Sequence, residues 1–272
     1  MIIDPRYIDV DMDSEAKRLG ILEGYIAPAD QRFSDGGGKC YGDVYPTLPE
    51  AERTAAIERL DAEGGSERLI TRIFDQDGEG SCVGNASTQG VQVLQAKQFG
   101  KDRVVQLSAI ATYKQIGSSA NSGANIDDAL EALTNVGTLP LDTPENRKRF
   151  GECVMPPIGF RTPFPANWKA TAKNFRIRES LQIRSIPQME TALINGHVIV
   201  VGRAGHSILY CRPTLKNGRG AIYANSWDRW GFGAGDFDYG FGMDTNRLVE
   251  ASAQWCWAIC SIVVPDFQVL AA

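Results

Sequence analysis

Three residues of the sequence carry side chains that together can activate a nucleophile: Cys82, His206 and Asn225. A cysteine attacks as a thiolate, a histidine can take the proton from the thiol, and an asparagine oxygen can accept the imidazole N–H and fix its tautomer. Each residue alone also has an ordinary structural explanation, as a small core residue, a polar strand end and a turn residue. Their combination predicts nucleophilic catalysis, provided that the fold brings the three together.

A long predicted helix positions the cysteine. Ser81 can act as an N-cap, so that Cys82 begins a helix that runs to about Phe99. The N–H groups and the dipole at such a helix start stabilise a thiolate, and we therefore expect the pKa of the Cys82 thiol to lie below its ordinary value of about 8.5. Small and apolar residues recur along one face of this helix, which predicts close packing on that face.

A predicted hairpin positions the histidine and the asparagine. His206 opens a strand at 206–212, and Asn225 lies near the end of a strand at 220–227. Between them, Asn217 and Gly218 can supply the positive φ angles of a tight turn. Because the strands of a hairpin run antiparallel, we expect His206 and Asn225 at the same end of the sheet.

The remaining pattern indicates helices first and strands afterwards. Helices are expected at 48–63, 126–136 and 187–195, the first with a capping box of Thr47 and Glu50 and the second capped by Asn125. Further strands are expected at 68–74, 197–203 and 254–264, and the stretch 138–180 is expected to be irregular. This order predicts an α+β fold with two lobes.

Composition limits the classes of function. The chain has 272 residues, of which 43% are hydrophobic and 22% charged, as in a soluble protein of one large or two small domains. Its net charge of −5 offers no basic surplus, so we expect no nucleic-acid partner. The longest strongly apolar run, 255–264, is about half of what crosses a bilayer, so we expect no membrane association. The N-terminus does not have the pattern of a signal peptide, which predicts a cytoplasmic or particle-assembled protein.

The cysteines and histidines do not suggest a metal site. Six scattered cysteines form no C-x-x-C pair, and the chain has only two histidines, so we expect neither metal nor cofactor. Cys256 and Cys260 would lie too far apart in one strand for a disulfide. Without a signal peptide we expect a reducing compartment and mostly free, buried thiols.

The segments around the three residues resemble those of the papain family of cysteine peptidases. Residues 76–82, QDGEGSC, look like the family's Gln-Gly-x-Cys-Gly-x-Cys segment, and residues 205–207 resemble the segment that carries its histidine. Residues 225–227, NSW, followed by Trp230-Gly231, resemble its Asn-Ser-Trp-Gly motif. The resemblance spans about 70–264 and is loose between these motifs.

This resemblance implies a papain-like two-lobe α+β fold with its active site in the cleft between the lobes. A helical lobe at 68–170 would contain the long central helix, an antiparallel β lobe would span 171–272, and residues 1–67 would form an N-terminal extension. Cys82, His206 and Asn225 would be catalytic, and the Gln76 side chain would join the backbone N–H of Cys82 in the oxyanion hole. The substrate would be a peptide or protein. The implied substrate-binding positions are Gly123, Ala124, Gly205 and Trp227.

Several departures from the family pattern bear on activity. Glu79 stands where the family has a disulfide cysteine, Val83 where it usually has tryptophan, and Ala124 where it has a second substrate-binding glycine. Only residues 202–205 separate the preceding strand from His206, so the wall on this side of the cleft must be trimmed or supplied by another segment.

Two classes of function fit these observations. The first is a cysteine endopeptidase that works through a thioacyl-enzyme. The alternative is a papain-like domain that serves as a structural or binding subunit of a large assembly such as a phage particle, with weak or no activity. A peptidoglycan hydrolase is a third, weaker interpretation.

The N-terminal extension, 1–67, has two interpretations of its own. It is either an inhibitory propeptide or a segment that docks on the main body or on an assembly partner. Ala56, Ile57 and Leu60 form a stripe too narrow to make a core alone, and no propeptide helix motif is visible. Both observations favour docking.

Overall fold

The computed structural model describes residues 38–76, 80–120, 122–150, 160–203, 205–226, 240–253 and 255–264. Within these ranges the α-helices are α2 (Glu50–Glu63), α3 (Cys82–Phe99), α4 (Ala109–Ile116), α5 (Ile126–Asn135), α6 (Pro144–Phe150), α8 (Trp168–Ala172), α9 (Ile186–Ile194) and α10 (Asn246–Ser252). Short 3-10 helices are η3 (Tyr41–Asp43), η4 (Ser66–Leu69) and η5 (Lys101–Arg103). The strands are β1 (Ile177–Gln182), β2 (Val198–Arg203), β3 (His206–Thr214), β4 (Gly220–Ala224), β5 (Phe241–Thr245) and β6 (Trp255–Ile262).

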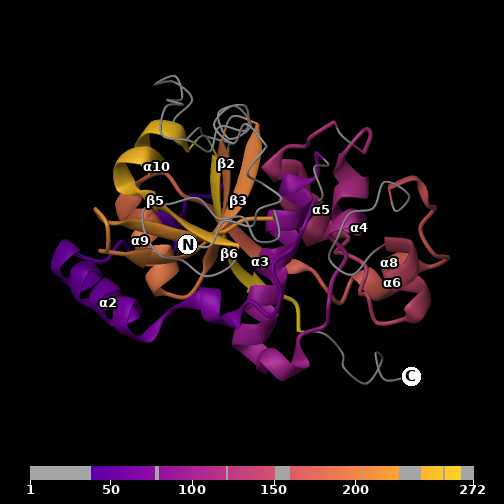
Figure 1. The fold of residues 1–272 in the computed structure, drawn as a ribbon, viewed down its shortest axis with the longest axis horizontal. Helices are drawn as coiled ribbons and strands as arrows, with labels where there is room; N and C mark the ends of the chain where they lie inside the picture. The colour runs from indigo at the N-terminus through magenta and orange to yellow at the C-terminus, as the bar shows by residue number, and fades with distance from the viewer. Residues whose placement is uncertain are drawn as a thin grey trace, which may run out of the picture.

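The strands form one six-stranded sheet in the order β1-β6-β2-β3-β4-β5, and every neighbouring pair is antiparallel. The predicted hairpin between β3 and β4 is present, with φ of 51° at Asn217 and 102° at Gly218. Helices α4, α5, α6 and α8 lie to one side of α3, and the sheet with α2, α9 and α10 lies to the other (Figure 1). The chain therefore has the predicted mixed α+β fold, with a helical part and an antiparallel sheet.

Helix α3 lies between these two parts and contacts both. It packs against α4 and α5 as well as β2, β3 and β6, and every residue from Cys82 to Ala96 is buried. The prediction of one packed face was therefore incomplete, because neighbours surround the helix. Three of its buried polar side chains bond to neighbouring segments: the Thr88 hydroxyl pairs with Thr112 at 2.7 Å, Gln92 Oε1 accepts the Leu107 N–H at 2.7 Å, and Gln95 Oε1 accepts the Val105 N–H at 3.1 Å.

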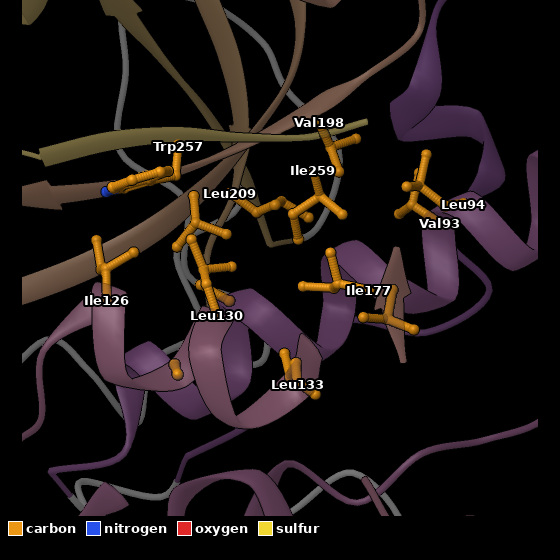
Figure 2. Packing of buried hydrophobic residues seen from close by; sticks show 14 of the residues in the cluster. Val93, Leu94, Ile126, Leu130, Leu133, Ile177, Val198, Leu209, Trp257 and Ile259 are labelled. Atoms are coloured by element: carbon orange, nitrogen blue, oxygen red, sulfur yellow. The ribbon is translucent and has the colours of Figure 1, made fainter. Parts of the chain in front are cut away.

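One hydrophobic core joins the helical part to the sheet. Figure 2 shows side chains of α3 and α5 packed against side chains of the strands. The labelled members are Val93, Leu94, Ile126, Leu130, Leu133, Ile177, Val198, Leu209, Trp257 and Ile259. Burial of this shared apolar surface holds the start of α3 in one place relative to the strands.

Helix α2, from the predicted N-terminal extension, packs on the sheet side of the molecule. Ala56 and Ile57 are buried and Leu60 is partly buried, and the helix contacts α9 and β3. The narrow apolar stripe is thus covered by the main body. Residues 1–37 of the extension lie outside the described residues, and the predicted boundaries at 67/68 and 170/171 remain predictions.

Several local predictions were wrong. Residues 68–74 do not form a strand: η4 ends at Leu69 and an irregular segment follows. Leu69, Ile70 and Ile73 pack against the core. The Thr47–Glu50 capping box is not used, because α2 begins at Glu50 with Pro49 at its N-cap and no side-chain cap. An apolar run also occurs in irregular segments, and a residue that can cap a helix need not do so. The local sequence therefore predicted a strand and a capping box that the structure does not have.

Two further expectations about local structure also need correction. The side chain of Asn125 does not cap α5 but donates to Asp128 Oδ2 at 3.1 Å. The stretch 138–180, predicted to be irregular, contains α6, α8 and β1. Strand β1 pairs with β6, far along the chain, and its last residue, Gln182, also bridges Cys40. In the part of the chain that the structure describes, no helix combines the length and the apolarity that a membrane span requires.

Glu190 of α9 ties α2 to the sheet through a buried charge network. Its carboxylate is 1% exposed and accepts hydrogen bonds from Arg53 Nε at 2.7 Å, from Arg219 Nε and Nη2 at 2.7 and 2.9 Å, and from Asn246 Nδ2 at 3.2 Å. Burial alone raises the pKa of Glu190, but these hydrogen bonds outweigh it and hold the pKa below its ordinary 4.5. The network therefore stabilises the folded chain while Glu190 is ionised.

We expect Glu190→Ala to lower the free energy of unfolding by about 3 kcal/mol, because it leaves Arg53 buried without its carboxylate. Urea denaturation measures this change. Because a lowered pKa stabilises the fold above the unfolded-state value, the difference from wild type should shrink as the pH falls below 4.5. The matched control is Glu145→Ala, which removes an exposed ion pair with Arg149 and should cost at most about 1 kcal/mol. Equal losses in the two variants would contradict the prediction.

Candidate active site

A cleft of about 480 Å³ lies at the start of α3, between the segment that leads into α5 and the ends of β2, β3 and β6. Five of the predicted site residues line this cleft: Cys82, Gly123, Ala124, Gly205 and His206. Among the described residues of the extension, 38–67, none lines it. The structure thus brings together residues from three separate parts of the chain.

His206 and Asn225 form the predicted hydrogen bond. Their side chains meet at 2.9 Å between Nε2 and Oδ1, and both residues are buried. Asn225 Oδ1 also accepts the backbone N–H of Ser226 at 2.9 Å. Because a carbonyl oxygen only accepts, Nε2 carries the ring proton and Nδ1 has the lone pair that can receive one from a thiol. Trp227, one of the implied substrate-binding positions, lies outside the described residues.

The tight turn between β2 and β3 presents His206 at the cleft. Arg203 pairs with His206 across the two strands, so the connection between them is short. Gly205, directly before His206, has a φ of 79°, in the left-handed region that favours glycine. The short connection agrees with the short spacing between the strand and His206 in the sequence.

Cys82 begins α3 as predicted, but its electrostatic environment differs from the prediction. Burial raises the pKa of the Cys82 thiol to about 11, although the backbone N–H groups of Ser207, Val83 and Cys82 itself act in the opposite direction. The expected low pKa is therefore wrong, because loss of hydration outweighs the helix start. Ser81, the expected cap, makes no side-chain cap bond. The effect of the Ser207 N–H also shows that the thiol lies close to the residue that follows His206.

Gln76 is held beside the segment that carries Asn225. The Ser226 hydroxyl donates to Gln76 Oε1 at 2.6 Å, and the Gln76 backbone N–H donates to Ser226 O at 2.8 Å. Fixing Oε1 in this way turns the amide nitrogen of the side chain away from Ser226. The role of Gln76 in an oxyanion hole stays a prediction.

Trp255 is a cleft residue that sequence reasoning missed. It opens β6 opposite Gly202 of β2, lines the cleft and is 37% exposed. Side chains of α5 and β6 approach Gly202 closely, since a Cβ there would lie 2.9 Å from Ile126 Cδ1 and 3.4 Å from Trp255 Cε3. Trp255 therefore supplies part of the wall that the short turn before His206 leaves open. Only the pairing of β2 with β6 places it there, and the aromatic WCW run was its one sequence signal.

Asp127 and Asp128 were also missed. They are the charged side chains among the described residues that line the cleft, and they lie in the first turn of α5. Burial holds the pKa of Asp127 above its ordinary 3.8. In the described ranges, no group of three or more His, Cys, Asp and Glu side chains is arranged to hold a metal ion.

The four other cysteines among the described residues do not line the cleft. Cys40, Cys211 and Cys256 are buried, Cys260 is partly buried, and all four are free thiols like Cys82. Burial raises the pKa of Cys211 and Cys260 above the ordinary range as well. Cys153 lies outside the described residues.

No protein-family model and no curated protein matches this sequence. Solved structures do match. Xylellain, a cysteine protease from Xylella fastidiosa, shares 16% identity and a TM-score of 0.56 over 71% of this chain and 82% of its own. Digestive procathepsin L 3 of Tenebrio molitor larval midgut shares 15% identity and a TM-score of 0.52 over 80% of this chain and 75% of its own. A structure from work on the mite allergens Blo t 1 and Der p 1 shares 15% identity and a TM-score of 0.57 over 92% of this chain and 83% of its own.

Identities this low carry information about the fold alone. The titles of two matching structures, xylellain and the ragweed pollen allergen Amb a 11, call them cysteine proteases. The mixed α+β arrangement of this chain, with a helical part and an antiparallel sheet, matches these structural neighbours. The chain therefore has a divergent papain-like fold.

Proposed function

We propose that this chain is a cysteine endopeptidase that hydrolyses peptide bonds through a thioacyl-enzyme. One observation carries the proposal: a single cleft is lined by Cys82 and His206, and His206 is bonded through Nε2 to Asn225. This is the arrangement of nucleophile, base and orienting amide that acyl transfer requires. The papain-like fold supports the same assignment.

In the first half-reaction His206 acts as the base. Because burial raises the pKa of Cys82 to about 11, the side chain is a thiol at neutral pH. Its proton passes to His206 Nδ1 as the sulfur attacks the carbonyl carbon, and Asn225 Oδ1 stabilises the resulting imidazolium. The amine then leaves with that proton, and the acyl group remains on the sulfur as a thioester.

In the second half-reaction water replaces the amine. His206 takes a proton from water, the resulting hydroxide attacks the thioester, and the carboxylic acid and the free thiol are released. In both steps negative charge develops on the carbonyl oxygen. The backbone N–H of Cys82 and the side-chain amide of Gln76 are the donors that we assign to it.

The buried thiol also favours one alternative, a papain-like domain used as a structural or binding subunit of an assembly. A thiol that is 8% exposed and has a raised pKa is poorly activated before substrate arrives. The two functions differ in covalent reactivity. A peptidyl chloromethyl ketone should alkylate Cys82 if the chain is a peptidase, and a purely structural subunit should stay unmodified.

We expect Cys82→Ala to abolish peptide hydrolysis, and His206→Ala to lower kcat by about 10²–10⁴-fold because the general base is lost. Asn225→Ala should retain partial activity, since it loses orientation only. Hydrolysis of a fluorogenic peptide and the mass of the chloromethyl ketone adduct measure these effects. Cys256→Ala, at a buried thiol outside the cleft, is the control and should react like wild type. Alkylation at Cys40 or Cys260, or a rate indifferent to His206→Ala, would overturn the assignment.

The raised pKa of Cys82 predicts a particular pH dependence. Below the pKa of about 11 the thiolate fraction rises tenfold per pH unit, so iodoacetamide should alkylate Cys82 roughly 100-fold faster at pH 9 than at pH 7. Peptide mass mapping of the folded, substrate-free chain measures the rate at this residue. A rate that is already constant between pH 6 and pH 9 would mean a preformed thiolate and would contradict the burial argument.

Asp127 and Asp128 lead to a preference for basic substrates. They give the cleft a negative charge, so we expect peptides with Lys or Arg near the scissile bond to have a several-fold higher kcat/KM than peptides with Glu there. Because the pKa of Asp127 is raised, its part of this preference should be lost on acidification at a higher pH than for an ordinary carboxyl of pKa 3.8.

The double variant Asp127→Asn/Asp128→Asn tests this preference, and competition between matched Lys and Glu peptides measures it. The selectivity ratio should fall about threefold to tenfold, which corresponds to the loss of a partly exposed ion pair. Asp142→Asn, which does not line the cleft, is the matched control. An unchanged ratio in the double variant would show that these carboxylates do not contact the substrate.

A further inference from the structure

A second, much smaller cavity lies beside Asn225. Its volume is about 10 Å³, and Ser207 is the residue that lines both it and the cleft. Its walls come from α3, from β3 and from the end of β4. The lining residues are Phe74, Asn85, Ala86, Gln89, Ser207, Leu209, Ala224, Asn225 and Ser226.

Three polar atoms of this cavity's lining residues are buried without a hydrogen bond. They are Asn85 Oδ1, Ser207 Oγ and Asn225 Nδ2, and none has a partner among the residues that the structure describes. The three residues are 0%, 1% and 2% exposed, respectively. Buried polar groups in folded proteins are almost always bonded to protein or to ordered water, so three such atoms in the walls of one cavity call for a shared partner.

In Asn85 and Asn225 the other polar atom of each side-chain amide is hydrogen-bonded to the protein. Asn85 Nδ2 donates to Ser81 O at 3.0 Å and to Ser81 Oγ at 3.1 Å, which leaves Oδ1 on the opposite side of the amide. Asn225 Oδ1 is bonded to His206 Nε2 and to the Ser226 N–H, which leaves Nδ2 on its opposite side. The cavity thus has an acceptor from Asn85, a donor from Asn225, and a hydroxyl from Ser207 that can do either.

We propose that one buried water occupies this cavity and that Asn85 positions Asn225 through it. About 10–15 Å³ is enough for a single water, and buried waters typically make about three hydrogen bonds. This water accepts from Asn225 Nδ2, donates to Asn85 Oδ1 and makes its third bond with Ser207 Oγ. The resulting chain of bonds runs from α3 through the water to Asn225 and on to His206.

These bonds prevent the side-chain amide of Asn225 from flipping by 180°. Rotation by 180° would direct its NH₂ group at the Nε2–H of His206, donor against donor, and would destroy the bond that fixes the histidine tautomer. Asn85 touches neither substrate nor the reacting atoms, so it is a positioning residue. Its meaning for catalysis rests on the proposed function, but the water and the His206–Asn225 bond do not.

The test reads that bond directly by NMR. The chain has only two histidines, so ¹⁵N-histidine labelling gives signals from His206 and His197 alone. His197 serves as the internal reference: it pairs with the Tyr41 hydroxyl at 3.0 Å, away from the cleft, and burial lowers its pKa to about 4. In Asn85→Leu we expect the Nε2–H of His206 to exchange with solvent about tenfold faster or more, with His197 unchanged.

Gln95→Leu is the matched control, because Gln95 is an equally buried amide on the same helix that bonds Val105 and does not line the cavity. It should leave exchange at His206 as in wild type. Ser207→Ala removes only the third partner of the water and should accelerate exchange less than Asn85→Leu. If Asn85→Leu does not fold, as the His197 signals would reveal, Ser207→Ala decides the question.

A crystal structure of the full chain at a resolution that resolves ordered water completes the test. We expect density for one water within hydrogen-bond distance of Asn85 Oδ1, Ser207 Oγ and Asn225 Nδ2. Protein partners for these atoms in place of a water, or unchanged exchange at His206 in both variants, would overturn the proposal. None of these measurements uses peptide hydrolysis, so an inactive chain refutes the proposed function without affecting this result.

Discussion

The burial of α3 between the helical part and the sheet is the constraint on which the rest of the structure depends. The helix is enclosed from Cys82 to Ala96, so water does not reach its polar side chains and several of them bond to other parts of the protein. Gln92 and Gln95 do so by accepting backbone N–H groups at 105 and 107. The helix is thereby tied to the helical part through polar bonds and to the strands through the shared core, and its first residue is fixed at the cleft.

The same burial sets the chemistry of the cysteine. Desolvation raises the pKa of Cys82 to about 11, against the backbone N–H groups of Ser207 and Val83 that favour the thiolate. A helix start is often associated with an activated thiol, but here it is the weaker of two opposing effects. In the proposed mechanism His206 therefore has to remove the thiol proton, and this transfer depends on the orientation of His206 by Asn225.

Buried polar networks support the fold at two distant places. Glu190 joins α2 to the sheet through Arg53 and Arg219, and it retains a lowered pKa because each of its oxygens is bonded. Beside the cleft, Asn85 and Asn225 are each held by one end of their amide. The partners of Glu190 come from different elements and fix how those elements sit, whereas Asn85 is held by Ser81 at the start of its own helix.

The sequence by itself determined what depends on local geometry. The start of α3 at Cys82 and the turn at Asn217-Gly218 are both encoded within a few residues, and the antiparallel hairpin then requires His206 and Asn225 to meet. Their motifs were sufficient to predict an α+β, papain-like fold. Local patterns failed where an apolar run such as 68–74 or a candidate cap such as Asn125 fits more than one structure.

Only the tertiary structure decided what depends on residues distant in the chain. Strand β1 exists because β6 pairs with it, and Trp255 lines the cleft because β6 also pairs with β2. The pKa of Cys82 and the cavity beside Asn225 follow from how completely the surrounding elements exclude water. Hydrogen bonds within a turn or a helix start can be predicted from neighbouring residues, whereas desolvation and strand pairing depend on every segment that packs against the site.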